Sequence, residues 1–193
     1  MTEEIKTADQ NENKGKKPIN WKKEIIEWTL TIVIPVVVAM LIHNYLFTFA
    51  RVDGDSMLDT FHTNNITGVS RLHYRLNEPQ RGEVITCRYD ETSKLYVKRI
   101  IGLPGETVEV KSGTVYINGE PLREDYLTRH DDFDFGPYEI GEDELLVMGD
   151  NRPVSLDGRI LGPIPVDYLY GRVMFVVYPF SEMRGTMDVP DYQ

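Results

Sequence analysis

The chain has 193 residues, of which 41% are hydrophobic, and its formal net charge is -10, from 21 basic and 31 acidic side chains. This acidic balance argues against a nucleic-acid-binding protein, which would show a basic patch. The single cysteine, Cys87, excludes an internal disulfide. The four histidines show no paired metal-ligand spacing, so we expect neither a metal site nor a cofactor.

The N-terminal part is expected to hold a tail and a membrane anchor. Residues 1–20 are polar and rich in Lys, Glu and Asn, which is typical of a disordered tail. Residues 28–50, WTLTIVIPVVVAMLIHNYLFTFA, contain no Asp, Glu, Lys or Arg. A helix of this length spans the roughly 30 Å core of a bilayer. We therefore predict an anchor helix over 21–50. One alternative is a buried core helix, for which the run is too long and too apolar. The other is a cleaved signal peptide, for which TFA at 48–50 is a passable cleavage site, but the run is longer than the usual apolar region of a signal peptide.

Charges on the two sides of this segment predict its orientation. Lys22 and Lys23 precede the apolar run, and Asp53, Asp55 and Asp59 follow it. The positive-inside rule then places the N-terminus in the cytoplasm. The expected protein is single-pass, and its residues 51–193 lie outside the cytoplasm.

Short β-branched runs recur beyond residue 50: GEVITCRY, KLYVKRIIG, ETVEV, GTVYING, ELLVMG and GRVMFVVYP. Turn signals such as GLPGE and GDNRP separate them. Asn118-Gly119 is a strong hairpin signal, because both turn positions need positive φ. The pattern predicts a mainly β domain with antiparallel pairing, in which Cys87 is a small buried strand residue. We interpret the acidic residues 129–144 as a solvated surface excursion.

Ser56, in the stretch GDSMLDT, is a candidate nucleophile that needs a group to take its proton. His62 is near in sequence, but no partner that would orient it is evident. A lysine acts as a base only when neutral, and burial among apolar groups lowers its pKa. Lys98 fits, because strand alternation places it on one face with Tyr96 and Ile100. The alternative is an edge-strand lysine that reaches into water.

Five features follow one another along the chain: the anchor, VDGDSMLDT, RGEVI, YVKRIIGLPGE and GDNRPVSLDGRILGPI. This ordered set resembles the bacterial type I signal peptidases over about residues 21–180. The resemblance implies an antiparallel β-sheet catalytic domain of the kind that signal peptidases share with self-cleaving SOS repressors. It also implies a Ser/Lys protease in which Ser56 is the nucleophile, Lys98 the general base and Ser155 the hydroxyl that orients the lysine. Gly54 stands where some members carry an oxyanion-hole serine, and glycine there is similar to Gram-positive members. A charged cluster is implied to brace the site: Arg99, Asp150, Arg152, Asp157 and Arg159.

Two residues depart from the family pattern. Asp59 stands where proline is usual, and Gly158 stands where serine is usual, which removes a hydroxyl near the base. The implied function is removal of signal peptides from exported preproteins, with signal peptides and the bilayer as partners and no nucleic acid. Two alternatives are a self-cleaving or substrate-restricted Ser/Lys protease, and an inactive membrane-anchored protein that binds exported peptides. Met57 is expected to be apolar surface directed towards the bilayer.

Overall fold

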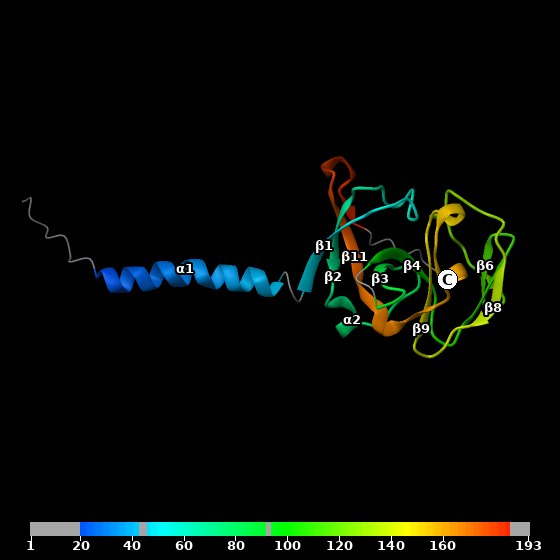
Figure 1. The fold of residues 1–193 in the computed structure, drawn as a ribbon, viewed down its shortest axis with the longest axis horizontal. Coiled ribbons are helices and arrows are strands. Elements are labelled where there is room, and N and C mark those ends of the chain that lie inside the picture. Colours follow the sequence, from blue (N-terminus) through cyan, green and yellow to red (C-terminus); the bar gives the residue numbers. More distant parts are fainter. Residues whose placement is uncertain (1–19, 43–45, 92–93, 186–193) are drawn as a thin grey trace, which may run out of the picture. The chain divides into compact units, whose positions relative to one another are not determined.

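The computed structural model describes residues 20–42, 46–91 and 94–185. The chain divides into two units, Met1–Met40 and Leu41–Gln193 (Figure 1). The predicted disorder of residues 1–19 lies outside the described residues.

The described part of the first unit is helical. Helix α1 (Trp21–Leu41) begins after Asn20, whose side-chain Oδ1 accepts a hydrogen bond from the Lys23 N–H at 3.3 Å. The helix has no buried residue, and a mean hydropathy of 2.0 over its most apolar stretch. Among the described residues it is the one helix long and apolar enough to cross a membrane, judged by length and composition. This is consistent with a single-pass membrane anchor.

The prediction that the helix continues to residue 50 is wrong. Helix α1 ends at Leu41, and residues 47–51, FTFAR, form strand β1 (Phe47–Arg51). All five residues of β1 pair with strand β2 (Ile66–Ser70) in antiparallel register, from Phe47 opposite Ser70 to Arg51 opposite Ile66. Hydropathy alone did not separate the two elements, because an apolar strand and an apolar helix score alike.

The second unit is built from two antiparallel sheets, which confirms the mainly β fold class. The larger sheet has the order β1-β2-β11-β3-β4-β9-β10, and β12 pairs with β11. Its other strands are β3 (Val84–Cys87), β4 (Tyr96–Gly102), β9 (Glu144–Met148), β10 (Ile164–Pro165), β11 (Leu169–Tyr178) and β12 (Arg184–Gly185). The smaller sheet has the order β7-β6-β5-β8, made of β5 (Thr107–Lys111), β6 (Thr114–Ile117), β7 (Glu120–Pro121) and β8 (Phe135–Glu139). Within this unit, β1, β2 and β11 lie at one end, and β6 and β8 lie at the other (Figure 1).

Short helices connect the strands. They are α2 (His73–Leu76), η2 (Arg152–Val154), α3 (Gly158–Leu161), η3 (Val166–Tyr168) and η4 (Phe180–Glu182). The hairpin predicted from the sequence is present between β6 and β7, where Asn118 has φ 53 and Gly119 has φ 88.

Buried apolar side chains fix the parts of the fold that surround the site. Met57 and Phe61, on the loop after β1, are 1% and 0% exposed and pack with Val69 and Val173 of the larger sheet. Met57 is therefore core and not surface, which corrects the sequence-based expectation. Cys87 is buried as predicted, and burial raises the pKa of its thiol to about 12.

Candidate active site

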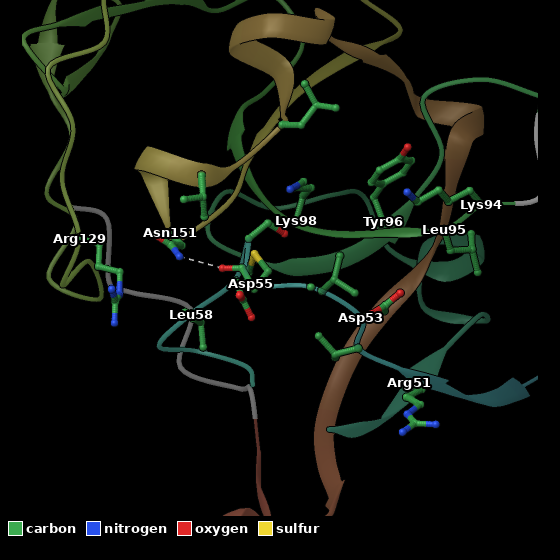
Figure 2. Close-up of a pocket in the computed structure, with 17 residues that line it drawn as sticks. Arg51, Asp53, Asp55, Leu58, Lys94, Leu95, Tyr96, Lys98, Arg129 and Asn151 are labelled. Atoms are coloured by element: carbon green, nitrogen blue, oxygen red, sulfur yellow. Dashed lines mark hydrogen bonds between the residues drawn. The ribbon is translucent and has the colours of Figure 1, made fainter. Parts of the chain in front are cut away.

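The loop that carries Ser56 is held by the hydrophobic core and by hydrogen bonds from Asn151. Met57 anchors it in the core. The Asn151 backbone N–H donates to the Ser56 carbonyl oxygen at 3.0 Å, and the Asn151 side-chain amide donates to the Asp55 carbonyl oxygen at 2.9 Å (Figure 2). Four residues on, the Thr60 hydroxyl donates to Asp150 Oδ2 at 2.5 Å. Ser56 itself is half-buried, so its side chain sits on a fixed backbone and still has access to solvent.

Lys98 is a buried lysine in an interior strand. Strand β4 lies between β3 and β9, and Lys98 pairs opposite Ile85 of β3, so the edge-strand alternative is wrong. Its side chain is 1% exposed, and its Nζ donates a hydrogen bond to Ser155 Oγ at 2.9 Å. Burial holds the pKa of Lys98 below the ordinary lysine value, although the nearby charge of Asp157 opposes the shift. Burial therefore favours the neutral amine at Lys98 relative to a lysine at the protein surface.

Gly149 separates Ser56 from Ser155. A Cβ added to Gly149 would lie 2.4 Å from the Ser56 carbonyl oxygen and 2.2 Å from Ser155 Oγ. Only a residue without a side chain leaves room for both groups. The glycine thus lets the backbone of the nucleophile loop pack against the hydroxyl that holds the lysine.

Ser56 and Lys98 line one groove of about 700 Å³. Its two main walls are formed by residues 51–58 and by residues 94–98, and Gly54 lies in the first wall with φ +96. Figure 2 shows Lys98 and Asp55 in the middle of this groove, with Arg129 on one side and Lys94 on the other.

Arg99 and Asp150 form a buried ion pair beside the site. The Arg99 guanidinium donates to both carboxylate oxygens of Asp150, at 2.9 Å from Nε and 2.6 Å from an Nη. The same guanidinium lies over the Tyr126 ring at 4.0 Å and donates to the Gly82 carbonyl oxygen. Because Asp150 also accepts from Thr60, this pair links β4 to the loop that carries Ser56.

Asp157 and Arg159 form the second ionic group, next to Gly149. Asp157 caps α3 and accepts hydrogen bonds from the Gly149 N–H at 3.0 Å and from Arg159 Nε at 3.0 Å. Burial alone would raise the pKa of Asp157, but the Arg159 contacts and the Gly149 N–H hold that pKa below its ordinary value. Gly158 between them is tightly packed, since an added Cβ would lie 2.8 Å from the Val147 carbonyl oxygen.

Residues 122–134, which connect β7 to β8 and which we name the strap, are tied to this cluster. Glu124 forms a two-point ion pair with Arg152, whose Nε donates to the Gly149 carbonyl oxygen at 3.1 Å. Asp131 pairs with Arg159 at 2.7 Å. Most side chains of residues 129–144 are exposed, as the interpretation of a solvated excursion expected. The interpretation is wrong for Asp131, which is bound to Arg159, and for residues 135–139, which form strand β8.

Several of these residues were missed by the sequence reasoning. Gly149 and Asn151 lie in GDNRP, which was taken as a turn signal, so that motif could have suggested them. Glu124, Tyr126 and Asp131 carried no local signal, since their partners lie far along the chain.

Among the residues that the structure describes, His62, His73 and His130 do not line the groove. His62 does have an orienting partner, because its Nδ1 lies 3.0 Å from Glu182 Oε2, but it does not line the groove. His73 lies 3.2 Å from the buried carboxylate of Glu83, away from the groove. Within residues 20–42, 46–91 and 94–185, no group of three or more His, Cys, Asp or Glu is placed to hold a metal ion.

Comparison with known proteins gives consistent matches. Residues 25–178 match the family described as "Signal peptidase, peptidase S26". The chain is 42% identical over 180 residues to signal peptidase I S of Bacillus subtilis, covering 87% of this chain and 97% of the relative. It is 40% identical over 198 residues to signal peptidase I T of the same organism, covering 96% and 100%. A crystal structure of a signal peptidase I from Enterococcus faecalis is 34% identical, with a TM-score of 0.45, and covers 50% of this chain and 97% of that one.

Proposed function

The chain belongs to the signal peptidase family, peptidase S26, a family of serine proteases, and from this premise we propose that it removes signal peptides from exported preproteins. One observation carries the proposal. A serine on a fixed loop and a buried lysine with a lowered pKa line the same groove. This is the pairing that acyl transfer needs when no histidine is available.

In the proposed first step, the neutral Lys98 amine takes the hydroxyl proton of Ser56. The Ser56 Oγ then attacks the carbonyl carbon of the scissile peptide bond. The Lys98 amine already donates to Ser155, so its lone pair is free to point elsewhere. Gly54 has no side chain to offer, so backbone N–H groups near Ser56 hold the oxyanion, and one such donor is worth roughly 3–4 kcal/mol.

In the second step, the Lys98 ammonium gives its proton to the leaving amine, and the mature protein departs. The signal peptide remains as an ester on Ser56. Lys98 next takes a proton from water, whose oxygen attacks the ester carbonyl carbon. The ester bond to Ser56 Oγ breaks, Lys98 returns the proton to this oxygen, and the signal peptide leaves with a free carboxyl group. The carboxylates of Asp157 and Asp150, which oppose the lowered pKa of Lys98, stabilise the ammonium during each transfer.

We further propose that the substrate binds as an extended strand between residues 51–55 and 94–97, which face each other across the groove. Shallow pockets there would accept small side chains at the first and third positions before the cut. Helix α1 would hold the enzyme in the membrane with residues 51–193 outside the cytoplasm, as the lysines before the apolar run suggest.

The test uses the full chain in detergent micelles and a peptide with alanine at the two specificity positions. We expect cleavage by the unmodified chain and none by Ser56→Ala or Lys98→Ala. Lys98→Arg is expected to be inactive as well, because arginine does not lose its proton near neutral pH. If the unmodified chain cuts no faster than Ser56→Ala, the proposal fails, and peptide binding without cleavage would instead indicate the inactive peptide-binding protein.

A further inference from the structure

We propose that Asp59 is a positioning residue for the nucleophile. Its carboxylate accepts a hydrogen bond from Thr128 and so ties the loop that carries Ser56 to the strap; we name this contact the clasp. The inference rests on the proposed function, because it concerns how Ser56 is held for its attack on a carbonyl carbon. Asp59 lies three residues after Ser56, on a stretch whose neighbours Leu58 and Ser56 both line the groove.

Both carboxylate oxygens of Asp59 contact the strap. The Thr128 hydroxyl donates a hydrogen bond to Asp59 Oδ2. An Nη atom of Arg129 lies 3.4 Å from Asp59 Oδ1. The hydrogen bond from Thr128 is the main reason that the pKa of Asp59 is below its ordinary value, so the carboxylate is ionised and accepting at neutral pH.

The two contacts are not equal in strength. The side chains of Asp59 and Arg129 are 46% and 50% exposed, and an ion pair with that exposure contributes little because solvent screens it. A hydrogen bond to an ionised acceptor is shorter and stronger than one between neutral groups. Thr128 is therefore the partner through which Asp59 acts, and Arg129 adds a minor contribution.

The strap is a firm point of attachment. Its Glu124 holds Arg152, and its Asp131 holds Arg159, and both arginines are buried beside Gly149. The clasp consequently ties the nucleophile loop to a segment that is already bound to the lysine's surroundings.

The clasp completes the support of the loop. Asn151 fixes the Ser56 carbonyl, and Asp150 fixes Thr60. The Leu58 N–H donates to the Asp55 carbonyl oxygen at 3.2 Å, but none of these three contacts involves Asp59. Asp59 stands where the family pattern usually has proline, whose ring restricts φ. Aspartate does not restrict φ in this way, so in this chain the contacts of the Asp59 carboxylate limit the motion of the loop instead.

The experiment measures kcat and KM of the full chain in detergent for Asp59→Ala, Thr128→Val and the double variant. We expect each single variant to lower kcat about 5-fold with KM within about 2-fold, because a small displacement of the attacking atom is costly. The double variant should lose no more than either single variant, because both remove one hydrogen bond. Asp59→Asn, whose amide oxygen still accepts from Thr128, should keep most of the activity.

Two further variants sharpen the test. Asp59→Pro, which installs the usual family residue, should make cleavage insensitive to Thr128→Val. The matched control is Asp125→Ala, which removes an ion pair of the same strap. In this pair the side chains of Arg123 and Asp125 are 82% and 64% exposed, and neither residue lines the groove. It should match the unmodified chain in kcat and KM.

Each outcome separates the two proposals. If the unmodified chain does not cut, the proposed function fails first. If the unmodified chain cuts, and Asp59→Ala has the same kcat and KM as the Asp125→Ala control, the positioning role of Asp59 is overturned while the proposed function stands. A change confined to KM, a loss that follows the unfolded fraction, or additive losses in the double variant would each overturn the positioning role.

Discussion

Replacing Gly149 with alanine tests the geometry of the site most directly. The new Cβ would lie 2.4 Å from the Ser56 carbonyl oxygen and 2.2 Å from Ser155 Oγ, whereas ordinary contacts begin at 3.4 Å. At least one of these groups must therefore move by about 1 Å, and a misplacement of that size costs about 100-fold in rate. The expected loss in kcat corresponds to about 2.7 kcal/mol of activation free energy.

The assay is cleavage of the alanine-containing peptide by the full chain, read as kcat and KM, with the thermal unfolding midpoint of the same samples. Gly141→Ala is the control, because the nearest atoms to its added Cβ belong to the flexible Glu144 side chain at 3.1 Å or more. We expect the control to stay within about 2-fold of the unmodified chain, since a flexible side chain gives way easily. A folded Gly149→Ala variant that keeps more than about a third of the unmodified kcat would refute the reasoning, since a 1 Å displacement cannot be that mild.

Three other predictions follow from the same contacts. Ser155→Ala removes the hydroxyl that Lys98 Nζ donates to, and kcat should fall about 10- to 100-fold with little change in KM; an unchanged kcat would contradict the orienting role. Lys98→Met should abolish cleavage and raise the thermal unfolding midpoint at pH 7, because the unfolded chain binds a proton that the buried lysine disfavours. The increase in the unfolding midpoint should shrink as the pH approaches about 10.4, where the lysine of the unfolded chain also loses its proton. An equal increase at pH 7 and at pH 9.5 would contradict the lowered pKa of Lys98. Glu124→Ala leaves the guanidinium of Arg152, whose side chain is 1% exposed, without its carboxylate partner. Urea unfolding should show that the free energy of unfolding falls by about 3–5 kcal/mol. A fall of less than about 1 kcal/mol would indicate that the pair behaves as a surface ion pair.

The strand pattern selected Lys98 as a candidate base, although it left the edge-strand alternative open. Period-2 alternation placed Lys98 on an apolar face, and the structure shows that face buried, with β4 between two other strands. The sequence did not reveal that β4 is an interior strand, because strand order depends on pairing between segments far apart. For the same reason the edge-strand alternative stayed open until the sheet was seen.

The end of the anchor helix and the role of the strap were beyond sequence reasoning for different physical reasons. FTFAR is apolar enough to extend a membrane helix, and only its pairing with β2 identifies it as a strand. Glu124 and Asp131 look like solvated acids, because their arginine partners each lie 28 residues further along the chain. Charge patterning within one segment detects neighbours three or four residues apart, and it has no information about such long-range pairs.

The strap also bears on how the lysine works as a base. Three buried arginines surround the site, and any of them left unpaired would be costly to the fold. Four carboxylates pair with them: Asp150 with Arg99, Glu124 with Arg152, and Asp157 and Asp131 with Arg159. The cluster therefore carries one more negative than positive charge, which favours the ammonium form, while burial favours the neutral amine. Burial has the larger effect on the pKa of Lys98, which is lowered. In the proposed mechanism, the excess carboxylate would limit the cost of the ammonium that forms when Ser56 gives up its proton. Two of the four carboxylates belong to the strap, and they pair with two of the buried arginines beside the site. The strap therefore helps to hold the charged cluster that surrounds Lys98 and the loop that carries Ser56.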